Sequence, residues 1–131
     1  MTVYQWRGPF TDPELNRLHG EAFDHPVGDT AWWDRVQRHS LGWVTARDAG
    51  QLIGFVNVVG DGGAHAFLLD TCTTPRLQGR GIGTALVSRA TAEATAAGCD
   101  WLHVDFVPEL KRFYLAACGF RATTAGLVSL R

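Results

Sequence analysis

Three glycines at alternate positions form the part of the sequence best suited to hold a ligand. Gly79, Gly81 and Gly83 lie in the segment Gln78–Thr84, directly before a run with helical periodicity. Glycine lets the backbone approach a ligand closely, and successive N–H groups where a helix begins converge on an anion. The same glycines would also suit a tight turn with close helix packing. The chemistry that this segment offers is the binding of a phosphate or diphosphate.

Two common phosphate motifs do not fit the segment. The dinucleotide fingerprint needs a third glycine three residues after the second, but the two possible alignments place Thr84 and Leu86 there. The nucleotide P-loop needs Gly-Lys-Ser/Thr after four spacers, and the chain has no such run. The glycines are therefore expected to follow another phosphate-binding pattern.

The elements that must position this segment alternate between strands and helices. Polarity, turn residues and helical spacing predict strands over residues 2–7, 41–47, 51–59, 64–73 and 100–107, helices over 11–23, 30–39, 81–97 and 108–118, and a β-prone stretch after residue 120. These elements predict an α/β (α+β) fold with a mixed central sheet. The sheet is antiparallel in its N-terminal half and parallel at the strand–helix–strand crossover. We interpret residues 1–131 as one domain.

Composition narrows the class of protein. The 131 residues are 46% hydrophobic and carry a formal net charge of -1, which favours one globular core and gives no attraction to nucleic acid. Three cysteines without Cys-x-x-Cys spacing predict no disulfide framework, and no apolar run nears the roughly 18 residues of a membrane span. The five histidines show no paired ligand spacing. We expect a cytoplasmic protein without a metal, a membrane or a nucleic-acid partner.

The stretch Thr73–Leu86 resembles the acetyl-CoA-binding motif of the GNAT superfamily of N-acetyltransferases. That motif is Gln/Arg-x-x-Gly-x-Gly/Ala, placed after a strand and a proline and where a helix begins, and Gln78, Gly81 and Gly83 match it here. The resemblance covers nearly the whole chain and rests mainly on residues 71–120. It implies a GNAT-like acyl-CoA acyltransferase fold, with acetyl-CoA as the acyl-donor substrate and no metal.

The resemblance also implies which residues hold the donor. Main-chain groups of Cys72 and Thr73 would hold the pantetheine arm, and Arg76 would add charge near the phosphates. The pyrophosphate would be wrapped by Gln78, Gly79, Arg80, Gly81, Ile82, Gly83 and Thr84. For the two arginine side chains, solvated surface remains the alternative.

By the same resemblance, the acetyl group would pass directly from acetyl-CoA to a primary amine, with Tyr114 as general acid. The main-chain N–H of Thr73 would meet the developing oxyanion. Four residues separate Tyr114 from Gly119, where the family usually has three, and one extra helical residue rotates a side chain by about 100°. Either the helix ends more loosely here or its register differs. The asparagine usual early in this helix has no counterpart at Val107–Glu109.

No single residue is marked out as the general base. Asp105 and Asp70 are both candidates, and each could instead make a structural hydrogen bond. His103 shares a strand face with Asp105 and is the third possibility. Family geometry would place the amine acceptor near the loop between the first two helices. The candidate acceptor-binding residues there are Asp24, His25, Trp32 and Trp33.

Two other functions remain open at this point. The chain could be a noncatalytic CoA- or drug-binding module of the same fold, or a protein or peptide N-acetyltransferase. A small-molecule amine is the expected acceptor, because the net charge offers no basic face for a macromolecule. Only residues 121–131 follow Phe120, barely enough for the last two strands of the family, and the open sheet edge predicts a possible homodimer.

Overall fold

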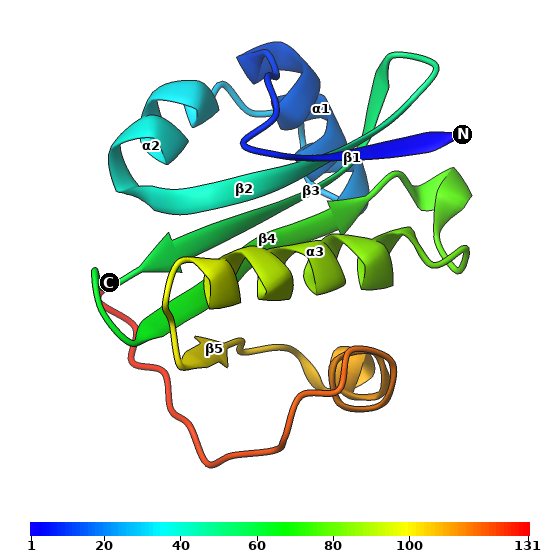
Figure 1. The fold of residues 1–131 in the computed structure, drawn as a ribbon. Helices are drawn as coiled ribbons and strands as arrows, with labels where there is room; N and C mark the ends of the chain where they lie inside the picture. Colours follow the sequence, from blue (N-terminus) through cyan, green and yellow to red (C-terminus); the bar gives the residue numbers. More distant parts are fainter.

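The computed structural model describes all 131 residues, which build a five-stranded sheet in the order β1-β2-β3-β4-β5 (Figure 1). The first four strands are antiparallel to their neighbours and β5 is parallel to β4. This confirms the predicted mixed sheet with a parallel crossover. The strands are β1 (Thr2–Trp6), β2 (Ser40–Asp48), β3 (Gln51–Gly60), β4 (His65–Thr73) and β5 (Trp101–His103).

Helices cover both faces of this sheet. α1 (Asp12–Ala22) and α2 (Trp32–His39) lie over one face, and α3 (Ile82–Ala96) lies over the other (Figure 1). Pro75–Leu77 and Pro108–Leu110 are short 3-10 turns, and Arg112–Ala117 is a π-helical segment on the α3 side. No helix in the chain combines the length and the apolar character that crossing a bilayer requires.

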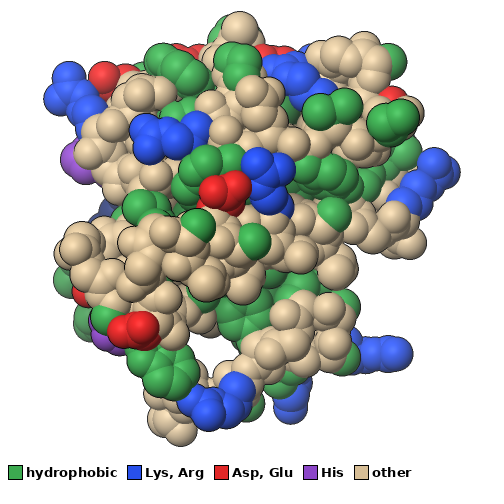
Figure 2. Space-filling view, viewed as in Figure 1, with side chains coloured by type: hydrophobic (Ala, Val, Ile, Leu, Met, Phe, Trp, Pro, Cys, Tyr) green, Lys and Arg blue, Asp and Glu red, His purple; other side chains and the backbone are tan.

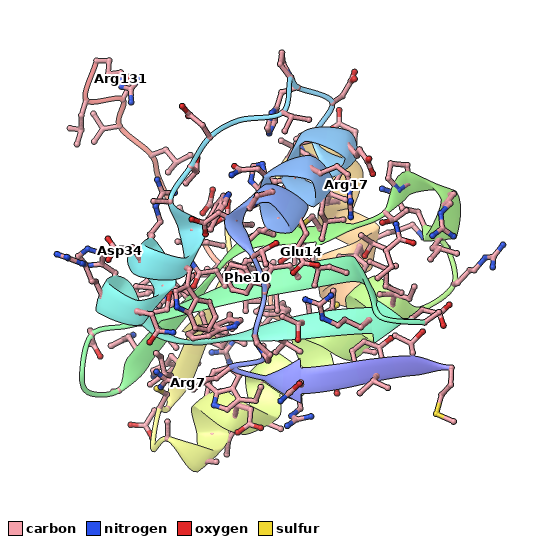
Figure 3. The ribbon with its side chains drawn as sticks, turned by 90° about the horizontal axis from the view of Figure 1, so that it is seen from above. Arg7, Phe10, Glu14, Arg17, Asp34 and Arg131 are labelled. Atoms are coloured by element: carbon pink, nitrogen blue, oxygen red, sulfur yellow. The ribbon has the colours of Figure 1, made fainter.

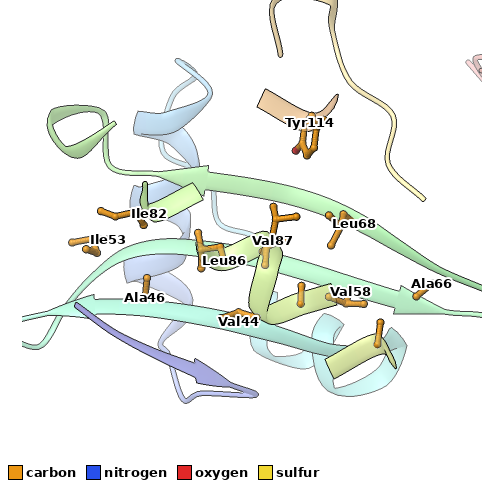
Figure 4. Close-up of a cluster of buried hydrophobic side chains, with 13 residues drawn as sticks. Val44, Ala46, Ile53, Val58, Ala66, Leu68, Ile82, Leu86, Val87 and Tyr114 are labelled. Carbon is orange, nitrogen blue, oxygen red and sulfur yellow. The ribbon is translucent and has the colours of Figure 1, made fainter. Parts of the chain in front are cut away.

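Two hydrophobic clusters hold the layers together. On the α3 side, Leu86 and Val87 pack against Val44 and Val58, and Tyr114 closes the cluster beside β4 (Figure 4). On the other side the buried residues are Phe10, Leu15, Leu18, Trp32, Val36, Trp43, Leu52, Phe55 and Cys72. Seen from above in Figure 3, Phe10 lies between α1 and α2 over the strands. β3 is buried on both faces, which explains its nearly continuous apolar sequence.

Three predictions about the C-terminal part differ from the structure: the end of β5, the stretch after Phe120 and the type of the last helix. β5 ends at His103 instead of Val107, because Trp101, Leu102 and His103 are its only residues paired with β4. The alternation of exposure continues to Val107, so the stretch stays extended without a partner strand. The residues after Phe120, expected to be β-prone, form no strand, since the short β5 offers little to pair with. The predicted helix over 108–118 is present, but as a 3-10 turn and a π-helical segment.

Candidate active site

The N-terminus of α3 is open. Gly81 is its N-cap residue with φ 86°, and no side chain caps the helix. None of the backbone N–H groups from Gly79 to Thr84 donates a hydrogen bond within the protein. A Cβ atom at Gly79 or Gly81 would meet nothing within 4 Å, so both glycines face open space. A row of unpaired amides at a helix N-terminus is suited to hold an anion such as a diphosphate.

The third glycine has a different reason to be small. A Cβ atom at Gly83 would lie 3.1 Å from Cζ of Phe113, so this glycine allows the C-terminal π-helical segment to pack against α3. The interpretation as close packing therefore applies to Gly83. Conformational freedom applies to Gly79 and Gly81, whose positive φ angles of 80° and 86° disfavour side chains.

The side chains around the open helix end are placed unequally. Gln78 Nε2 donates to the carbonyl of Thr73 at 3.3 Å and ties the glycine segment to the end of β4. Arg76 is held on the surface by Gln51 at 3.1 Å, and Arg80 is exposed without an ion partner. The side chain of Ile82 is buried in the core, so only its backbone is available to a ligand.

β4 is free along half of its length beside this end. Its parallel pairing with β5 stops at Phe67 and His103, while β4 continues to Thr73. Thr74 N–H donates to Ile53 of β3 at 2.8 Å. Because neighbouring residues of an antiparallel strand point their N–H groups to opposite sides, the N–H of Thr73 points away from β3, into the space that β5 has left.

A β-bulge lies in the same free half of β4. The register with β3 shifts between Phe55 and Asn57, so Asp70 and Thr71 together face the single residue Val56. Asp70 adopts φ 58°, an uncommon conformation for a non-glycine residue. Bulges of this kind redirect side chains and are frequent next to active sites.

Cys72, also on the free half of β4, is buried against the α1 and α2 side. Burial, with a smaller effect of the neighbouring Asp70 charge, raises the pKa of its thiol far above the ordinary value. The residue is therefore a neutral core side chain and offers a ligand only its main-chain groups.

The π-helical segment resolves the register of Tyr114. Cys118 N–H donates to Phe113 five residues back at 2.9 Å, and Phe120 N–H donates to Tyr114 at 2.9 Å. The wider π turn absorbs the extra residue that separates Tyr114 from Gly119, so the side chain still points inward. Its exposure is 5%, and its ring stacks on Phe106 with centroids 5.0 Å apart.

Tyr114 is held in its protonated form. Burial raises the pKa of its phenol, and the contact with Thr71 on the β4 bulge opposes this only in part. The nearby Asp105 carboxylate raises the pKa further. A neutral phenol beside the free half of β4 is able to donate a proton to a leaving group there.

On the opposite side of the bulge, Asp70 contacts His19, which in turn contacts His25. Asp70 Oδ1 lies 3.1 Å from Nε2 of His19, and Nδ1 of His19 lies 2.7 Å from Nε2 of His25. The sequence had singled out Asp70 and His25 for different roles and missed His19, which joins them. The signal was present: His19 is four residues after the buried Leu15 and therefore shares its sheet-facing side of α1.

The remaining candidates lie apart from this group. Asp105 is exposed, and His103 is not oriented by it. His103 instead faces His65 at 2.7 Å and stacks on Phe67. Asp24 is exposed in the loop after α1. Trp32 is only 4% exposed and belongs to the core, whereas Trp33 is 38% exposed, so of the two tryptophans only Trp33 is accessible to an acceptor.

A groove of about 920 Å³ runs between the β4–β5 edge and the C-terminal segment. Its walls are mostly apolar and include Phe67, Leu69, Trp101, Phe106 and Phe120. Figure 2 shows the molecule hollowed between its main body and this segment, with hydrophobic atoms in the recess. The groove meets the site at Asp105 and Phe106, close to the ring of Tyr114.

A mixed sheet that opens beside β4 and leads into an uncapped, glycine-rich helix N-terminus is the GNAT acyl-CoA acyltransferase fold. The chain belongs to the Acetyltransferase (GNAT) family, whose members it matches over residues 2–120. It is 40% identical over 80 residues to mycothiol acetyltransferase from Nocardia farcinica. That match covers 61% of this chain and 26% of the relative, so the chain spans about a quarter of the relative's length.

Solved structures share the fold over the full length. A probable acetyltransferase of unknown function from meticillin-resistant Staphylococcus aureus superposes with a TM-score of 0.83 and 19% identity, covering 100% of this chain and 99% of that one. The aminoglycoside N-acetyltransferase AAC(6')-Iy, solved with CoA, has a TM-score of 0.78 and 19% identity, with 100% and 95% covered. At these identities the likeness concerns the fold alone.

Proposed function

We propose that this chain transfers an acetyl group from acetyl-CoA to a primary amine of a small molecule, with donor and acceptor bound together. One observation carries the proposal: the unpaired N–H groups from Gly79 to Thr84 lie directly beyond the free half of β4. The family, the CoA-bound aminoglycoside acetyltransferase of the same fold and the mycothiol acetyltransferase relative support it.

The donor would be held entirely by groups that the fold leaves free. The amides from Gly79 to Thr84 would bind the pyrophosphate, with a helix-dipole contribution of about 0.3–1 kcal/mol per negative group. Main-chain groups of Cys72 and Thr73 would hold the pantetheine arm along β4. This arrangement brings the thioester to the bulge, between Tyr114 and Asp70.

The chain's own groups then divide the work of the transfer. Holding two reactants in place removes on the order of 7–11 kcal/mol of the barrier in well-oriented systems. The N–H of Thr73 is aimed at the space where the oxyanion develops, and Tyr114 protonates the departing thiol. Asp70 is our choice of proton acceptor, because it lies beside Thr71, which Tyr114 contacts, while Asp105 is exposed in the groove.

The acceptor would enter past the loop between α1 and α2. Asp24 and His25 lie in that loop, and the accessible Trp33 follows it. A carboxylate and an aromatic ring suit a cationic amine. Both named relatives act on small molecules according to their names, which supports the same class here.

Calorimetry and mass spectrometry test this function. We expect CoA and acetyl-CoA to bind near neutral pH. We also expect the protein to acetylate at least one member of an amine panel, which raises the mass of that amine by about 42 mass units. Absence of any binding to CoA or its thioester would overturn the proposal.

Tyr114→Phe separates an enzyme from a binding module: an enzyme keeps donor binding and loses roughly 100-fold or more in kcat.

We also propose that two copies associate through the β5 edge. This edge has no partner strand, and the C-terminal segment exposes Leu127, Val128 and Leu130 at 81–92%. An exposed strand edge next to unburied aliphatic side chains is a ready surface for pairing. Light scattering should show a dimer, and Val128→Asp should shift it toward the monomer. A monomer at all concentrations would exclude this association.

A further inference from the structure

Three side chains and one carbonyl form a continuous row from the bulge of β4 to solvent. Asp70 Oδ1 lies 3.1 Å from His19 Nε2, His19 Nδ1 lies 2.7 Å from His25 Nε2, and His25 Nδ1 lies 2.7 Å from the carbonyl of Pro26. The exposure of the side chains is 20% for His19 and 28% for Asp70, while His25 is exposed. We call this set the Asp70–His19–His25 row.

The row is held by elements that fix each ring. Asp70 sits on the bulge of β4, and His19 lies in the last turn of α1. The ring of His19 lies 5.3 Å from Trp32 and 4.5 Å from Phe23, centroid to centroid. The N–H of His25 donates to the Gly20 carbonyl at 3.0 Å, which fixes the loop. Because His19 uses its two ring nitrogens on different neighbours, the groups are linked in a line instead of surrounding one point.

Counting hydrogens shows that the row has two states. Each of its three contacts needs one hydrogen, since the carboxylate and the Pro26 carbonyl are acceptors only. Two neutral imidazoles and a carboxylate supply only two hydrogens. In that state one of the three contacts has no hydrogen, so its two acceptor atoms repel each other and the contact lengthens. With one added proton, all three contacts become hydrogen bonds. The row therefore has a place for one added hydrogen, and by geometry either ring can carry it.

The groups around the row do not exchange protons with it. On β4 the neighbouring Cys72 is a buried, neutral thiol. From α2, Arg35 Cζ lies 4.8 Å from the ring centroid of Trp32, and the Trp32 ring is the neighbour of His19. In the loop, Asp24 precedes His25 and is exposed. No charged side chain other than Asp70 makes a hydrogen bond with either histidine.

We infer that the Asp70–His19–His25 row is the proton acceptor of the transfer and conducts the proton from the bulge to solvent at His25. The inference rests on the proposed acetyl transfer. In that step the amine nitrogen forms a bond to the acetyl carbon and the carbon–sulfur bond breaks. Tyr114 gives its proton to the sulfur, and the amine's surplus proton passes to Asp70. The row releases one proton to water at His25, and Tyr114 takes one proton back from water, so the protons balance.

Asp70 and Tyr114 lie on opposite sides of β4, which suits this division of roles. Asp70 faces α1 through His19, while its neighbour Thr71 faces Tyr114. In the tetrahedral intermediate the amine nitrogen and the sulfur are two separate substituents of the acetyl carbon, so the two protons move at different places. A donor on one side of the strand and an acceptor on the other therefore match the two protons that must move. In these roles Asp70 is the catalytic residue, and His19 and His25 are positioning residues that act through it.

His25→Gln separates conduction from structure. Glutamine accepts from or donates to His19 and still reaches the Pro26 carbonyl, so the hydrogen bonds remain while the extra proton is no longer needed. The matched control is His39→Gln, because the side chain of His39 is exposed and makes no hydrogen bond. We expect His25→Gln to lower kcat about 10-fold, with unchanged CoA affinity, and to move the acid limb of the pH–rate profile to lower pH. The control should match the wild type.

Nitrogen NMR of the imidazole rings reads the row in the free protein, without any acetyl transfer. In the wild type the ring nitrogens of His19 and His25 should change together in one transition, and in His25→Gln the transition of His19 should move. Independent transitions of the two rings would overturn the row. Full kcat in His25→Gln across the pH range, with CoA bound normally, would overturn conduction while the transferase function stands. Loss of CoA binding in the wild type would instead reject the proposed function.

Discussion

The N-termini of α1 and α3 differ in how their free N–H groups are satisfied. At α1, Thr11 accepts from the N–H of Glu14 at 3.4 Å, and the Glu14 carboxylate accepts from the N–H of Thr11 at 2.7 Å. Arg47 closes the group with contacts of 2.8 and 2.9 Å to the same carboxylate. At α3, Gly81 offers no side chain, and the first turn has no acidic residue.

The N-terminus of α2 is closed by groups of the chain, as at α1 and unlike at α3. Its N-cap residue Ala31 cannot cap, but Asp12 of α1 accepts from the N–H of Trp33 at 2.8 Å. Two helices on one face of the sheet thus have their ends closed by the chain's own carboxylates and hydroxyls. Only α3, at the end of the free half of β4, is left open. An end that serves the fold is closed within the chain, and the end that is open is available to a ligand.

Closing the open end should have the largest effect. Thr84→Glu places a carboxylate in the first turn of α3, where two negative charges about 5 Å apart repel by about 3 kcal/mol at an effective dielectric of about 20. We expect CoA to bind roughly 100-fold more weakly in calorimetry. The helix itself should gain about 0.3–1 kcal/mol, so the thermal midpoint should not fall.

Ala92→Glu is the control for this change. Ala92 is exposed on α3 and lies away from its N-terminus, so the variant adds the same charge to the same helix. Its CoA affinity should equal that of the wild type. Equal losses in both variants would mean that overall charge, and not the helix end, governs donor binding.

Removing the ion pair at the closed end of α1 should have an intermediate effect, on stability alone. Glu14→Gln keeps a residue able to complete the capping box but removes the ion pair with Arg47, whose side chain is 26% exposed. We expect the free energy of unfolding to fall by about 2 kcal/mol at pH 7, because the guanidinium loses its charged partner. Glu21→Gln on the same helix is the control. It removes an exposed ion pair with Arg17 at 3.9 Å and should change the free energy of unfolding little.

The pH dependence of the stability difference between the wild type and Glu14→Gln tests whether the ion pair with Arg47 causes it. The hydrogen bond and charge of Arg47 lower the pKa of Glu14 in the folded protein. The stabilisation is therefore present above the ordinary glutamate value of about 4.3 and is lost as the pH falls through the lower folded value. Chemical denaturation at several pH values should show the wild type and Glu14→Gln converging in acid. A difference independent of pH would contradict the ion pair.

The same comparison shows what the sequence can predict. Thr11, Pro13 and Glu14 mark the start of α1 by local chemistry, and the helix predicted over 11–23 begins at Asp12, with Thr11 as its N-cap residue. The glycines before α3 likewise predict an open helix end. Signals of this kind act between residues near in sequence, so the sequence alone is enough to recognise them.

The features that could not be predicted depend on distant parts of the chain. The end of β5 is set by where β4 stops pairing with it, although the alternating pattern continues to Val107. The inward direction of Tyr114 depends on a π turn, which a count of residues leaves open. The link between Asp70 and His25 requires His19 from α1, 51 residues before Asp70.

Removing the hydroxyl cap of α1 should have the smallest effect. Thr11→Ala leaves one N–H of the first turn without its acceptor, and loss of such a cap costs about 1 kcal/mol. We expect that loss in chemical denaturation, with CoA affinity unchanged, because the α1 end binds no ligand. Thr124→Ala, in the exposed C-terminal segment, is the control and should leave stability as it is. Weaker CoA binding in Thr11→Ala would show that the two helix ends are coupled through the sheet and do not have separate roles.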